Sequence, residues 1–146
     1  MAQLTFPIKA AGLEVPVWIG LSGRAMNDLR AAGQSIPFPL QARGLIDTGT
    51  NVTSVASWLL HRLAIPIASA SSTHTAQGKV GVNLYEVGLL ITDPALPGSP
   101  NLTQPDLVVM ELPATLPDAD VLIGLEVLLE RKLLVDGPAR HFIIEF

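Results

Sequence analysis

The chain has 146 residues, 49% hydrophobic and 15% charged, and this length corresponds to about one domain. Its net charge is −4, and it has no run of basic residues that could bind along a phosphate backbone. We therefore expect no nucleic-acid partner. The absence of cysteine excludes disulfides, thiolate metal sites and a cysteine nucleophile.

We expect a single domain over residues 1–146, and the sparse charge favours a surface that is partly buried against a partner. Lys9 and Glu14 interrupt the first apolar residues, which is not typical of a signal peptide. No uncharged apolar stretch reaches the roughly 18 residues that a membrane span needs. A cytoplasmic protein without a membrane partner is therefore the expectation.

Short apolar runs separated by 12 Pro and 12 Gly predict a mostly β domain. The first two strands flank a tight turn at Ala11-Gly12, and an insertion at about 23–39 carries a helix over 23–33 and then an extended Pro-rich segment. A long hairpin has Gln77-Gly78 near its tip, and residues 94–105 are predicted as loop. The predicted strands cover residues 4–10, 13–21, 43–46, 67–76, 79–92, 107–112, 121–123, 133–135 and 141–146.

Two further helices are predicted. Thr53 or Ser54 can cap a helix that continues to Leu63 and ends before Pro66. A short helix follows the strand at 121–123 and runs through Leu129.

The sharpest chemical feature is Asp47-Thr48-Gly49 at the end of an apolar strand. An acid in that position is costly unless it is paired or hydrogen-bonded, and glycine allows a sharp turn and a close backbone approach. Asp, Thr and Gly are also common turn residues, so the tripeptide alone is more often a plain turn. A second feature follows about 75 residues later, where the apolar run 121–123 leads into Gly124 and a short helix.

Together and in this order, the two features resemble the retropepsin-like (retroviral-type) family of aspartic peptidases, and in particular its bacterial single-domain members. The resemblance implies a mostly β fold, a closed acid-protease barrel with a flap hairpin and one or two short helices, acting as a homodimer. Retroviral enzymes usually carry an Asp–Arg ion pair where this chain has Asn51 and Leu125. Both partners are missing together, so no charge is left unpaired, and we expect the dimer to be braced in another way.

The chemistry of this family needs two carboxylates that share one proton, the ionised one activating water and the protonated one polarising the scissile carbonyl. The chain has one Asp-Thr-Gly, and its other Asp residues near prolines do not follow a matching strand. The second carboxylate is therefore expected to be Asp47 of another copy related by a two-fold axis. No cofactor and no metal are implied.

By resemblance, Thr48 bonds across the dimer and Gly49 offers its carbonyl to the substrate backbone. If Thr50 donates a hydrogen bond to the carboxylate, it favours the ionised form, which predicts an acidic optimum that moves up in Thr50→Ala. Substrate is expected to bind as an extended strand under the flap, with apolar side chains preferred. The substrate-binding candidates are Asn51, Ala76, Gln77, Gly78 and Lys79.

Other polar residues favour structural roles. His61, His74 and His141 share no metal-like spacing, although His74 near the flap could tune a response to pH. Ser54, Ser57 and His61 lie at helical spacing without an orienting acid or a nucleophile-elbow sequence. Two functions stay open: an active dimeric aspartic endopeptidase, favoured by the complete Asp-Thr-Gly, and a catalytically weak peptide-binding or dimerisation module on the same fold.

Overall fold

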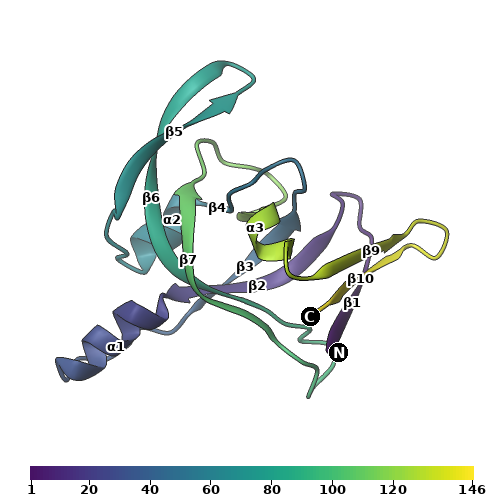
Figure 1. Ribbon diagram of the computed structural model, residues 1–146, viewed down its shortest axis with the longest axis horizontal. Coiled ribbons are helices and arrows are strands. Elements are labelled where there is room, and N and C mark those ends of the chain that lie inside the picture. Colours follow the sequence, from purple (N-terminus) through teal and green to yellow (C-terminus); the bar gives the residue numbers. More distant parts are fainter.

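A computed structural model describes residues 1–146 as a mostly β protein with a closed barrel of six strands and three short helices, which matches a retropepsin-like fold (Figure 1). The strands are β1 (Gln3–Pro7), β2 (Glu14–Leu21), β3 (Leu40–Ile46), β4 (Ser54–Val55), β5 (Ser69–Thr75), β6 (Gly78–Ile91), β7 (Leu102–Glu111), β8 (Val121–Ile123), β9 (Lys132–Asp136) and β10 (His141–Glu145). The helices are α1 (Gly23–Ala31), α2 (Ser57–Arg62) and α3 (Leu125–Leu128).

The barrel closes because β2 has two neighbours. The larger sheet has the strand order β2-β3-β8-β4-β7-β6-β5, and a further pairing of β2 with β6 joins its ends and leaves β5 outside. Alternate residues of the paired strands face inward, so that Val17, Ile19, Leu89 and Ile91 are almost fully buried. The predicted mostly β class and barrel are confirmed.

The strands β5 and β6 form the flap hairpin. The lower part of β6 pairs with β7 as far as Leu84, while its upper part pairs only with β5 between Ser69 and Thr75. Figure 1 shows this two-stranded part rising from the barrel and curving over it. The turn comprises Ala76 and Gln77, because Thr75 pairs with Gly78, which lies at a positive φ of 116°. The predicted flap hairpin is confirmed.

A separate sheet with the order β1-β10-β9 brings the two ends of the chain together. Ala2 and Phe146 exchange backbone hydrogen bonds of 3.0 and 2.9 Å. The predicted closing hairpin is confirmed, and β9 is its outer strand. The tight turn at Ala11-Gly12 is present, but the two strands that it connects lie in different sheets.

The predicted start of the second helix is wrong. Thr53 and Ser54 do not cap it; Ser54 and Val55 form β4, and the helix begins at Ser57 after Ala56, whose side chain cannot cap. The Thr53 hydroxyl instead accepts the backbone N–H of Gly124 at 3.0 Å, a residue 71 positions away in the chain. Three helices are found, as the sequence predicts segment by segment; the resemblance implied one or two, and α1 in the insertion exceeds that number.

The predicted loop over 94–105 ends earlier than expected, since β7 begins at Leu102. Leu102 pairs with Ile91 and is fully buried. This burial in the barrel outweighs the preference of the proline-rich segment for a loop conformation. The ladder shifts register between Val87 and Leu89, and Pro105 lies at this irregularity, where a missing N–H is tolerated. None of the helices is both long and apolar enough to cross a membrane.

Candidate active site

The strand β3 carries Asp47 out of the barrel next to β8. These two strands run parallel, with Ile46 opposite Ile123, and the Asp47 N–H donates to the Ile123 carbonyl at 2.9 Å. Ile46 and Ile123 are buried, whereas Asp47 is half-exposed and Thr48 and Gly49 are exposed. The barrel therefore fixes the base of the turn and presents its polar residues to solvent.

The Asp47 carboxylate is held by its own turn. Its Oδ1 accepts the Gly49 N–H at 2.9 Å, and the Thr50 N–H closes the turn on the Asp47 carbonyl at 3.4 Å. A Cβ at position 49 would lie 3.1 Å from that same Oδ1, which is tighter than an ordinary contact. Glycine at this position thus lets the carboxylate accept the bond without crowding.

The far end of the turn is tied to the segment that follows β8. The Leu125 N–H donates to the Thr50 carbonyl at 2.9 Å, and the Glu126 N–H to the Asn51 carbonyl at 3.4 Å. Thr53 makes two hydrogen bonds to this segment. Its hydroxyl accepts the Gly124 N–H, and its own N–H donates to Glu126 Oε1 at 2.6 Å. The Asp-Thr-Gly turn and the late glycine, both found in the sequence, therefore lie side by side.

The role expected of the Thr50 hydroxyl is wrong within the protomer. It donates to the Val52 carbonyl at 3.0 Å and not to the Asp47 carboxylate. Because a hydroxyl has one proton to donate, the argument for a pH shift in Thr50→Ala has lost its basis. Asn51 is exposed and Leu125 is half-buried, and both side chains are uncharged.

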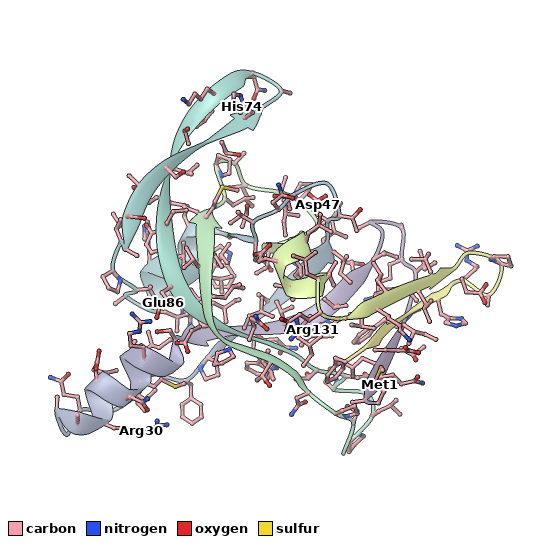
Figure 2. The ribbon with its side chains drawn as sticks, viewed as in Figure 1. Met1, Arg30, Asp47, His74, Glu86 and Arg131 are labelled. Carbon is pink, nitrogen blue, oxygen red and sulfur yellow. The ribbon has the colours of Figure 1, made fainter.

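The four candidates at the flap tip, Ala76, Gln77, Gly78 and Lys79, are all exposed. Thr75 stiffens this tip, because its hydroxyl accepts the Gln77 N–H at 3.2 Å and donates to the Gly78 carbonyl at 3.1 Å. Figure 2 shows His74, near the tip, and Asp47 on the same side of the barrel. The tip and the Asp47 turn are therefore separate in the protomer and face the same side.

The flap is polar, whereas the substrate side chains expected to lie under it are apolar. The strand β5 reads Ser-Ala-Ser-Ser-Thr-His-Thr, and its side chains are exposed or half-exposed. Val80 and Val82 on β6 are the apolar members near the tip, and Val82 is already buried in the protomer. Hydroxyl groups therefore dominate the surface of β5.

A hydrogen-bonded cluster at the base of the flap is one feature that sequence reasoning missed. Glu111, the last residue of β7, accepts the Ser57 hydroxyl on Oε1 at 2.7 Å and the Asn83 amide on Oε2 at 3.4 Å. Asn83 immediately precedes Leu84, where β6 leaves its pairing with β7. The cluster thus connects the flap hinge at Asn83 and Leu84 to the start of α2. No local sequence motif predicts it.

An ion pair joins β3 and β8 beside the other end of their paired segment. Asp120 Oδ2 accepts the Arg43 N–H at 2.9 Å and Nε at 3.2 Å, and Oδ1 accepts Nη2 at 3.3 Å. Burial alone would raise the pKa of Asp120, but the hydrogen bonds and the charge of Arg43 together hold that pKa below its usual value. The same contacts raise the pKa of Arg43.

The histidines do not converge on one another. No group of three or more His, Asp or Glu side chains is arranged so that it could hold a metal ion. His61 and His74 are exposed, and His141 is half-exposed at the start of β10. Ser57, at helical spacing from His61, uses its hydroxyl to donate to Glu111.

A comparison with protein-family models finds no match, and a comparison with curated proteins finds no relative. Among solved structures, the chain is similar to the crystal structure of a retropepsin-like aspartic protease from Rickettsia conorii. The TM-score is 0.58 at 12% sequence identity, over 99% of this chain and 91% of that chain. At this identity the similarity establishes the fold and leaves the activity of this chain to be argued from its site.

Proposed function

We propose that this chain is an aspartic endopeptidase of the retropepsin-like family, and that it hydrolyses peptide bonds as a homodimer with Asp47 of each subunit in the site. The observation that carries the proposal is the Asp47 carboxylate itself. It lies at the end of β3, accepts the Gly49 N–H at 2.9 Å and is half-exposed on a turn anchored to β8. A carboxylate held rigidly at the surface of such a fold is suited to activate water.

A second copy is needed because this chemistry uses two carboxylates with one proton between them. Two features support such a pairing. The Thr48 side chain is exposed and makes no hydrogen bond within the protomer, so it is free to bond across a two-fold axis beside Asp47. The edge of β9 is unpaired, and Leu129, Leu134 and Val135 around it are 77%, 49% and 55% exposed.

In the dimer, the ionised Asp47 takes a proton from a water molecule that attacks the scissile carbonyl. The protonated Asp47 of the other subunit polarises that carbonyl and later gives a proton to the leaving amine. No metal ion and no cofactor takes part in this scheme. The residues that support it are Thr48 and Gly49 on the turn and Thr50 as part of its backbone.

Substrate binds as an extended segment between the Asp47 turn and the flap, in the manner of an added β-strand. Backbone groups of Gly49 and of the tip residues Ala76 to Lys79 face such a segment, and Asn51 lies beside it. Because hydroxyl side chains dominate β5, we propose that the flap accepts polar as well as apolar substrate side chains. This replaces the expectation of a purely apolar preference.

The test is cleavage of a diverse peptide mixture between pH 3 and 8 by the wild type and by Asp47→Asn, with the dimer verified for both. Asp28→Asn, an exposed residue of α1, is the matched control. Cleavage by the wild type and the control, and none by Asp47→Asn, supports the proposal. Silence of a dimeric wild type at every pH would favour a catalytically weak peptide-binding or dimerisation module on this fold.

A further inference from the structure

Glu126 is the one charged side chain from outside the segment 47–53 that bonds to it. Its Oε1 accepts the Thr53 N–H at 2.6 Å, and Thr53 is fully buried. The side chain crosses from the first turn of α3 to a residue 73 positions away in the chain.

The other carboxylate oxygen of Glu126, Oε2, destabilises the folded protein. Oε2 is buried and has no hydrogen-bond partner, and none of the three ion pairs of the chain includes Glu126. A buried carboxylate oxygen without a partner is costly, so its presence calls for an explanation beyond packing. An apolar side chain of the same size would fill the space without that cost.

Gly124 gives the carboxylate room to reach Thr53. A Cβ at position 124 would lie 2.5 Å from Glu126 Oε2, 2.8 Å from the Val52 carbonyl carbon and 3.0 Å from the Thr53 nitrogen. The Gly124 N–H at the same time donates to the Thr53 hydroxyl. Glycine and carboxylate thus act together on one residue, Thr53.

Thr53 also links this contact to the barrel. Its carbonyl accepts the Met110 N–H of β7 at 2.9 Å, while the other end of the turn is held by the bond from the Asp47 N–H to Ile123. The turn is therefore fixed at both ends, and Glu126 supplies the side-chain contribution at the far end. Displacing that end would shift the loop that carries the Asp47 carboxylate.

We propose that Glu126 is a positioning residue, which fixes the Asp47 turn by accepting the Thr53 N–H. The proposal rests on the proposed peptidase activity for its effect on catalysis, whereas its effect on the turn is independent of any reaction. It concerns Oε1 as a hydrogen-bond acceptor, because none of the ion pairs of the chain includes Glu126.

The experiment compares Glu126→Gln, which keeps an acceptor oxygen, with Glu126→Met, which fills the same space without one. Glu130→Gln and Glu130→Met are matched controls, since Glu130 is exposed and makes no side-chain hydrogen bond. In Glu126→Met we expect amide exchange at Thr53 to accelerate about tenfold or more, as a bond to a charged acceptor is lost. We expect kcat to fall about 10- to 100-fold with KM nearly unchanged.

Glu126→Gln is expected to restore Thr53 protection and to keep kcat within about threefold of the wild type, a rescue that packing alone does not predict. Wild-type exchange and kcat in Glu126→Met would overturn the proposal, as would a Gln variant as impaired as Met. If Glu126→Met does not fold, the shorter Glu126→Asp takes its place, with the same expected loss. Exchange is measured without substrate, so an inactive wild type would refute the peptidase proposal and still leave this one decided.

Discussion

The Arg43 guanidinium and the Asp120 carboxylate join β3 and β8 next to the point where their parallel pairing begins, and the same two strands lead to Asp47 and Gly124. Asp120 accepts Nε and Nη2 of Arg43 at 3.2 and 3.3 Å and the Arg43 N–H at 2.9 Å. The Arg43 Nη1 donates in addition to the Pro117 carbonyl at 3.0 Å. The pair of strands that presents the candidate site is thus fixed at its base by a forked contact and at its top by the Thr53 bonds.

Asp120→Asn is expected to lower the free energy of unfolding at pH 7, because a charge-assisted contact is lost, and solvent around the exposed Arg43 keeps the effect small. The pKa of Asp120 is lowered in the folded protein, so its contribution is present above the unfolded pKa of about 3.9 and disappears as pH falls through the folded value. Urea unfolding at pH 7 and near pH 2, with Asp28→Asn as control, measures this. A difference between wild type and Asp120→Asn that is equally large near pH 2 would contradict it.

Gly124→Ala is expected to cost about 1–3 kcal/mol, since a methyl group would meet the backbone of Val52 and Thr53 and not just a flexible side chain. Gly137→Ala is the matched control, because a Cβ at position 137 meets nothing within 4 Å. The free energy of unfolding of both variants gives the comparison. Equal free energies of unfolding for Gly124→Ala and Gly137→Ala would show that the loop after Thr50 can move to make room for a methyl group. That loop would then not be the rigid support that the contacts imply.

The parts of the fold that the sequence predicted are those encoded locally. Asp47-Thr48-Gly49 after an apolar run and Gly124 after a second one identified the two segments that meet at the candidate site. The flap turn was evident from Gln77-Gly78, since glycine at a positive φ is a local requirement.

The errors came from contacts between distant parts of the chain. Thr53 looked like a helix cap, but its N–H and hydroxyl bind residues more than 70 positions away and its neighbour Ser54 enters a strand. The early start of β7 depends on burial of Leu102 against the barrel, which periodicity near prolines does not reveal. The sequence Gly124-Leu125-Glu126 held a signal for the Thr53 contact, in the acid two residues after the glycine.

Asn83→Ala is expected to loosen the flap, because it removes the bond between the hinge of β6 and Glu111. At 3.4 Å this bond is long, so we expect a modest effect, with amide exchange in β5 and the tip rising about two- to fivefold. KM should rise more than kcat falls, since the flap contributes to substrate binding in the proposed function. Asn101→Ala, an exposed residue before β7, is the control, and unchanged flap exchange in Asn83→Ala would show that the hinge does not depend on Glu111.

Val135→Lys is expected to weaken the proposed homodimer without unfolding the protomer. Val135 is 55% exposed on β9, the edge strand of the smaller sheet, so a lysine there is tolerated in the monomer. When the free edges of two β9 strands meet, the two lysines place like charges together. We expect the dissociation constant, measured by sedimentation velocity, to rise about tenfold or more, with peptidase activity falling in parallel at low protein concentration. Val108→Lys is the matched control, since Val108 is 50% exposed on β7, away from this edge. An unaltered dissociation constant in Val135→Lys would mean that the two subunits meet elsewhere, and the Thr48 side of the Asp47 turn would then have to supply the whole interface.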